Sequence, residues 1–118
     1  MQHRNKLNLF SELQLSAAMQ RQLAEANFIH PTPVQAEALP PALEGRDVLA
    51  TAQTGTGKTL SFLIPLAERM AIETKDAKAL VLLPTRELAM QVLDAWRGLT
   101  QGQGRAALVC GGLAEAPR

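Results

Sequence analysis

The chain has 118 residues, 47% of them hydrophobic, which suffices for one domain with an apolar core. Lys and Arg almost balance Asp and Glu, so the net charge of +1 provides no general basic surface for nucleic acid. Three Phe and one Trp exclude an extensive aromatic platform, and a single cysteine, Cys110, excludes an intramolecular disulfide. Because there is no long apolar run and no signal-peptide layout, we expect a soluble cytoplasmic protein.

Residues 8–44 are predicted to hold two helices joined by an extended segment. Ser16 is a candidate N-cap for the first helix, which should run through Ala26. Phe28 begins the extended segment, because the chain ahead of a proline avoids the helical conformation. The Phe28 ring has two open interpretations, since it can stack on a nucleotide base or pack as a core aromatic.

The second helix has a well-marked start. Thr32 can cap it, Pro33 suits its first turn, and Gln35 stands where a capping box places Glu or Gln. We expect a pause at residues 40–41, where two prolines follow each other. Gln35 also permits a functional interpretation, because its amide carries the acceptor and the donor that match the N6/N7 edge of adenine. On these residues alone both roles stay open.

A phosphate-binding loop is the strongest signal in the chain. Residues 47–51 indicate a short buried strand, residues 52–59 have the sequence AQTGTGKT, and an apolar helix start follows. Strand, glycine-bearing loop and helix in this order are typical of a phosphate loop. The alternative is a flexible loop with a solvated lysine. Ala52 stands at the place of the usual first glycine, a departure that some phosphate loops allow.

Each residue type in this loop has a chemical reason. Gly55 and Gly57 let the backbone curl so that several N–H groups point into one concavity. The following helix adds free amides and the positive end of its dipole. Lys58 would reach the β- and γ-phosphates, and the Thr59 hydroxyl would bind Mg²⁺. Lys58 and Thr59 are therefore the candidate catalytic residues, with Thr59 as the candidate metal ligand.

Strands and helices are predicted to alternate through residues 45–118. The loop helix should run to about Met70 with a bend at Pro65, and residues 79–83 indicate a second buried strand. Thr85 is a candidate cap for a helix through about Leu99, and residues 106–110 indicate a third strand. This order predicts an α/β fold in which helices cover a parallel sheet through right-handed crossovers.

Several sequence blocks together resemble the DEAD-box RNA helicases. The blocks are FIHPTPVQ at 28–35 with Phe10 upstream (similar to the family's Q motif), AQTGTGKT at 52–59 (motif I), PTRELA at 84–89 (motif Ia) and Gly111-Gly112. Asn27 is a departure, because the Q motif usually begins with glycine. The resemblance implies the N-terminal part of the first of two RecA-like domains, a phosphate-loop nucleotidase fold that stops before the Walker B strand. Residues 1–118 would form one partial domain.

The resemblance also implies roles for individual residues. Gln35 becomes the expected adenine reader, with its capping role as a compatible second duty. The residues implied in binding ATP or ADP are Phe28, Gln35, Ala52, Gln53, Thr54, Gly55, Thr56, Gly57, Lys58 and Thr59. Those implied in contacting RNA are Pro84, Thr85, Arg86, Gly111 and Gly112. Such contacts would bind the sugar-phosphate backbone and position RNA without reading its sequence.

Elements that the family uses for hydrolysis do not occur in the sequence. It has no Asp-Glu-Ala-Asp string, no Ser-Ala-Thr string and no second RecA-like domain, so we expect nucleotide binding with negligible turnover. In the family, other strands lie between those that lead to motifs I and Ia. We therefore expect a gap or exposed strand edges, with rearranged strand order or self-association through strands.

Two other functions compete with the helicase interpretation. A non-enzymatic adenine-nucleotide module would use the same loop and Gln35 without any role in RNA binding. A small-molecule kinase would also use a strand–loop–helix phosphate site. The kinase interpretation leaves the PTRELA block at 84–89 unexplained, and no stretch resembles a lid over an acceptor substrate.

Overall fold

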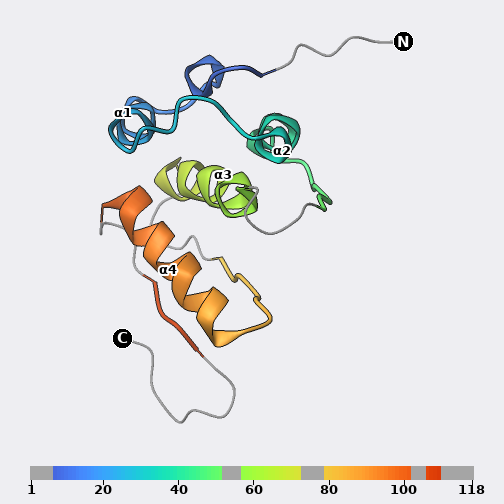
Figure 1. Ribbon diagram of the computed structural model, residues 1–118, viewed down its shortest axis with the longest axis vertical. Helices are drawn as coiled ribbons and strands as arrows, with labels where there is room; N and C mark the ends of the chain where they lie inside the picture. The colour runs from blue at the N-terminus through green and yellow to red at the C-terminus, as the bar shows by residue number, and fades with distance from the viewer. Residues whose placement is uncertain (1–6, 52–56, 73–78, 102–105, 110–118) are drawn as a thin grey trace.

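The protein is represented by a computed structural model that describes residues 7–51, 57–72, 79–101 and 106–109 (Figure 1). The helical elements in these residues are η1 (Phe10–Glu12), α1 (Ala17–Glu25), α2 (Pro33–Leu43), α3 (Lys58–Ile72) and α4 (Arg86–Thr100). Helix α3 contacts α2 on one side and α4 on the other, and α1 contacts α4 and η1. The helix that begins at the phosphate loop is therefore central to the assembly.

The predicted helix starts are confirmed. The Ser16 Oγ accepts a hydrogen bond from the Met19 N–H at 3.2 Å, so Ser16 is the N-cap of α1. The Thr85 Oγ1 accepts from the Leu88 N–H at 3.1 Å, so Thr85 is the N-cap of α4. Asn27, just beyond the end of α1, has φ 69°, a left-handed conformation that asparagine adopts more readily than most residues.

The predicted pause at the paired prolines is wrong. Helix α2 continues through Pro40 and Pro41 to Leu43. The Glu44 N–H closes the last turn by donating to the Pro40 and Pro41 carbonyls at 3.3 and 3.1 Å. Leu39, immediately before the prolines, is fully buried, so packing holds this turn although proline cannot donate. Helix α3 likewise continues through its interior proline, and it ends two residues later than predicted.

One apolar core joins the helices. Leu63 and Ile64 of α3 are completely buried, and they share this core with Val92 and Trp96 of α4. The members of this core are Phe10, Leu13, Met19, Leu23, Leu39, Leu63, Ile64, Ala67, Val92, Trp96 and Leu99. Within the residues that the structure describes, no helix is long and apolar enough to cross a membrane.

The predicted parallel sheet is not confirmed. Across the described ranges no residue lies in a strand, and residues 46–51, 79–83 and 106–109 belong to neither a helix nor a hydrogen-bonded ladder. Exposure alternates along the second segment, where Leu80 is 82% exposed, Val81 38% and Leu82 81%. The predicted burial of this segment is therefore wrong, although the period of two is that of a strand. A ladder needs a neighbour about 4.8 Å away, and these segments do not provide one for each other.

Candidate nucleotide-binding site

Gln35 and the end of the phosphate loop are in direct contact. The Gln35 Nε2 donates a hydrogen bond to the Gly57 carbonyl at 3.0 Å, joining the first turn of α2 to the residue that precedes α3. The Gln35 Oε1 accepts from the Thr32 N–H at 2.8 Å, and the Thr32 Oγ1 accepts from the Gln35 N–H at 3.4 Å. The predicted capping box is therefore confirmed, and the same amide also links two predicted nucleotide motifs.

Gly57 is required at this contact for two independent reasons. Its φ of +87° is one that residues with a Cβ rarely adopt. A Cβ at this position would also lie 2.4 Å from the Gln35 Nε2 and 3.1 Å from the Thr32 Oγ1, so the glutamine would have to move. The glycine thus lets the loop approach the α2 capping box.

The Gln35 amide retains hydrogen-bonding capacity for a ligand. A side-chain amide has two donor hydrogens and two acceptor lone pairs. The contacts to Gly57 and Thr32 use one of each, which leaves one donor and one acceptor. Gln35 is nevertheless only 4% exposed. A base can therefore pair with this amide only if the remaining donor and acceptor lie in the small part of Gln35 that is exposed.

The start of α3 carries the two candidate catalytic residues. Lys58 is the first residue of α3 and its side chain is exposed, while Thr59 follows and is half-buried. The first amides of a helix have no partner inside it, and they can donate to an anion. The rest of the predicted loop, residues 52–56, lies outside the described residues.

Two phenylalanines before α2 form a pair with different exposure. Phe10 is buried, whereas Phe28 is 43% exposed, and the rings meet edge to face with centroids 6.5 Å apart. The backbone fixes both, because the Phe28 N–H donates to the Leu23 carbonyl at 2.8 Å and the Phe10 N–H to the Ile29 carbonyl at 3.0 Å. Phe28 thus packs against a core aromatic while part of the residue stays exposed, and both interpretations of its role remain open.

The predicted RNA-contacting residues that are described lie at the start of α4. Pro84, Thr85 and Arg86 are all exposed, and the Thr85 hydroxyl is already occupied as the N-cap. This end of α4 is the one remote from α1 (Figure 1). Among the described residues, no hydrogen bond joins Thr85 or Arg86 to Gln35 or Gly57. Gly111 and Gly112 lie outside the described residues.

The contact between Gln35 and Gly57 was not predicted from the sequence. The two residues are 22 positions apart, and each pattern was complete without the other. Both motifs contain hydrogen-bond donors and acceptors, but neither motif indicates which distant residue its groups contact. The only usable sign was the glycine itself, because a glycine just before a helix indicates a close approach or a positive φ.

Two solved structures of known proteins share the arrangement of this chain. The RNA-helicase Prp28 from Chaetomium thermophilum, bound to ADP, matches 95% of this chain with a TM-score of 0.81 and 32% identity. A DEAD box protein from Methanococcus jannaschii matches 93% with a TM-score of 0.80 and 36% identity. The matched part is 29% and 31% of those chains. The described part of the chain thus resembles part of a RecA-like helicase domain in fold.

The family follows from the sequence comparison. The model for DEAD/DEAH box helicases matches residues 32–117, and the chain belongs to this family. The ATP-dependent RNA helicase DBP4 of Cryptococcus neoformans is 45% identical over 113 residues, and DRS1 of Lodderomyces elongisporus is 49% identical over 98 residues. The match covers 92% and 81% of this chain. It spans only 13% and 14% of those two proteins.

Proposed function

We propose that this chain is the adenine-nucleotide-binding part of an ATP-dependent RNA helicase. The observation that carries the proposal is the hydrogen bond from the Gln35 amide to the Gly57 carbonyl, because it links a base-reading group to a phosphate loop. Family membership supports it, as does a relative of known structure that holds ADP. A non-enzymatic nucleotide module is the second candidate, since the site by itself requires only binding.

Nucleotide binding divides between the two ends of this site. The Gln35 acceptor would take a hydrogen from the adenine N6 while its free donor reaches N7, a pairing that guanine cannot make. Phe28 would stack on the base with its exposed ring. At the start of α3, Lys58 and the free amides would hold the phosphates. The loop residues proposed to curl around the phosphates are Ala52, Gln53, Thr54, Gly55 and Thr56.

A magnesium ion fits the donor chemistry at the start of α3. Thr59 is the proposed ligand, because it directly follows the lysine at the helix N-terminus and carries a hydroxyl. When bound, Mg²⁺ neutralises charge on the β- and γ-phosphates. The chain's own contribution is to hold the phosphates in place. Lys58→Ala should therefore weaken ADP binding, which titration calorimetry with and without Mg²⁺ would measure.

Nucleotide selectivity tests the proposed role of Gln35. ADP should bind more tightly than GDP, and Gln35→Ala should remove the preference. Gln35→Glu is the sharper variant, because glutamate keeps a capping-box acceptor but cannot donate to N7. Gln35→Glu also loses the bond to the Gly57 carbonyl, so loss of the adenine preference would support base reading only in a folded variant that still binds pyrophosphate. An unchanged ADP to GDP ratio would reduce Gln35 to its capping role.

RNA is the proposed macromolecular partner of the whole protein. Pro84, Thr85 and Arg86 would contact the sugar-phosphate backbone, together with Gly111 and Gly112, without reading sequence. Arg86 supports this role because it is exposed at a helix start. A second RecA-like domain of the whole protein would supply the remaining catalytic groups. We expect this chain to release negligible phosphate, and RNA-stimulated turnover well above that of Lys58→Ala would contradict that expectation.

We further propose that residues 46–51, 79–83 and 106–109 are strands of a parallel sheet in the whole protein. Their outward side chains, such as Leu80 and Leu82, are apolar and exposed, so isolated chains should associate through them. Sedimentation should show concentration-dependent association that Leu80→Lys with Leu82→Lys abolishes. Met90→Lys on α4 is the matched control, since Met90 is also exposed. A monomer at high concentration with cooperative melting would contradict the proposal.

The location of the protein in the cytoplasm stays a prediction.

A further inference from the structure

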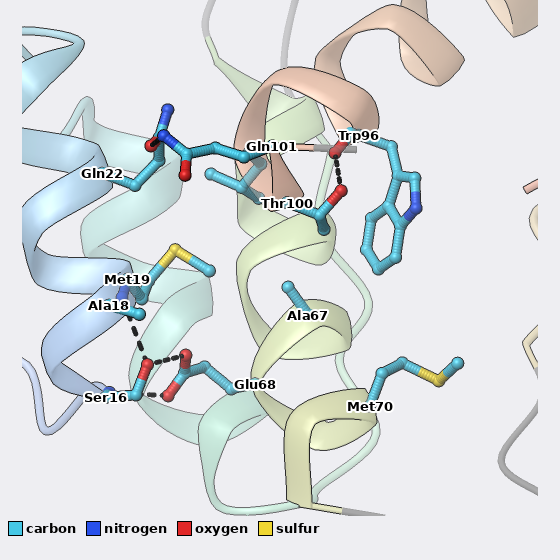
Figure 2. A pocket seen from close by; sticks show the side chains of 11 residues that line it. Ser16, Ala18, Met19, Gln22, Ala67, Glu68, Met70, Trp96, Thr100 and Gln101 are labelled. Carbon is cyan, nitrogen blue, oxygen red and sulfur yellow. Dashed lines mark hydrogen bonds between the residues drawn. The ribbon is translucent and has the colours of Figure 1, made fainter. Parts of the chain in front are cut away.

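Helix α1 is fixed to α3 by a two-bond clamp, shown in Figure 2. The Glu68 carboxylate of α3 accepts from the Ser16 N–H at 2.8 Å and from the Ser16 Oγ–H at 2.9 Å. The negative charge lies at the N-terminus of α1, where the helix dipole favours it. The clamp borders a cavity of about 350 Å³ between α1, α3 and α4. The two hydrogen bonds fix the N-terminal end of α1 to α3, the helix that begins at Lys58.

Contacts farther along α1 limit how it can move. The Gln22 Nε2 donates to the Gly98 carbonyl of α4 at 3.0 Å, and the Gln22 Oε1 accepts from the Gln101 side chain. Met19 and Leu23 are buried in the shared core. A helix held by a pivot in its middle and a clamp at its start tilts when the clamp is released.

The other end of α1 sets the position of the Phe28 ring. After α1 ends, Asn27 turns the chain with φ 69°, and the Phe28 N–H donates back to the Leu23 carbonyl at 2.8 Å. Phe28 is thus bonded directly to the last turns of α1. The nine residues of α1 form a rigid spacer about 13 Å long between Ser16 and this ring.

We propose that Glu68 is a positioning residue for nucleotide binding, which acts by holding the Phe28 ring at a fixed place relative to the phosphate loop. The phosphate loop and the Phe28 ring are both positioned from α3, because Lys58 starts this helix and Glu68 clamps α1 ten positions later. With the pivot at Gln22, three residues or about 4.5 Å from the last residue of α1, a tilt of about 12° displaces that end of the helix by about 1 Å. A misplacement of that size is enough to weaken stacking on a base whose phosphates are already held.

This inference depends on the proposed function, because it assumes that Phe28 stacks on the base. It differs from a purely structural role of Glu68 in one measurable respect. A structural role would change the binding of ADP and of pyrophosphate together, since both need a folded α3. Positioning of Phe28 changes only the binding that depends on the base. The ratio of the two affinities therefore separates the alternatives.

The experiment measures the affinities of ADP and pyrophosphate for the 118-residue chain. Glu68→Ala should weaken ADP binding about five-fold and pyrophosphate binding less than about two-fold, because only the stacking contact is lost. Glu68→Gln should restore ADP binding to within about two-fold of wild type, since its amide oxygen still accepts from the Ser16 N–H. Glu25→Ala, an exposed acid on α1, is the matched charge control and should change neither affinity.

A double variant tests the route through Phe28. Phe28→Ala should weaken ADP binding to a similar extent, and Glu68→Ala should add less than about two-fold in that background, because the ring it positions is gone. Equal losses of ADP and pyrophosphate binding in Glu68→Ala, or additive losses in the double variant, would overturn the positioning role. If the wild-type chain binds pyrophosphate as tightly as ADP, the adenosine contributes nothing to binding. That result would overturn the proposed function, and the inference with it.

Discussion

Gly57→Ala probes the contact between the α2 capping box and the phosphate loop. The added Cβ would meet the Gln35 Nε2 at 2.4 Å, so the amide must leave the Gly57 carbonyl. The left-handed φ of +87° costs about 1–2 kcal/mol for a residue with a Cβ. Losing the Gln35 bond and displacing a buried amide costs a further 1–3 kcal/mol or so. We expect the free energy of unfolding to fall by about 2–5 kcal/mol.

Gly45→Ala is the matched control for this prediction. Gly45 has the same φ of +87°, but a Cβ there would meet only the Arg69 Nη1, at an ordinary 3.6 Å. It should therefore cost only the conformational strain of about 1–2 kcal/mol. The assay is urea unfolding of both variants, in wild type and in a Gln35→Ala background. Removing Gln35 should shrink the difference between the two costs to what the Thr32 Oγ1 contact at 3.1 Å leaves, and an undiminished difference without Gln35 would refute the reasoning.

Three further predictions test the packing and capping of the helices. Leu39→Ala should lower the free energy of unfolding by about 2–5 kcal/mol because Leu39 is fully buried, whereas Leu82→Ala at an exposed position should change it little; thermal melts compare them. Thr85→Ala should cost about 1 kcal/mol through loss of the α4 cap, and Thr85→Ser should cost little; equal effects in urea unfolding would argue against the cap. Glu44→Ala removes an exposed ion pair to Arg46, so a loss of stability well above about 1 kcal/mol would contradict the structure.

Helix starts could be predicted because their causes are local. Ser16, Thr32 and Thr85 each cap a helix whose first turn lies within three residues of the cap. Side chain and bonded amide are then neighbours in sequence, and tertiary structure has little opportunity to override them. The same locality explains the failure at Pro40. Proline disfavours a helix locally, but burial of the adjacent Leu39 stabilises the turn that the prolines weaken.

Contacts between distant segments could not be predicted from these patterns. Ser16 and Glu68 are 52 positions apart, and nothing in either segment indicated that they meet. The apolar run at 79–83 predicted a buried strand, yet Leu80 and Leu82 are exposed, because burial and pairing depend on neighbours that a local pattern does not specify. The motif residues were recognised because a phosphate loop is local, whereas its contact with Gln35 is a property of the fold.

The most direct test of the central claim is to follow the Gln35 side-chain amide by nitrogen-15 NMR while nucleotide is added. The signal is assigned as the one that disappears in Gln35→Ala. The account predicts that saturating ADP moves both Gln35 Nε2 proton resonances much more than pyrophosphate or GDP does, because the remaining donor then binds adenine N7. If ADP and pyrophosphate move these resonances equally, the amide senses only the phosphate loop. In that case Gln35 does not read the base.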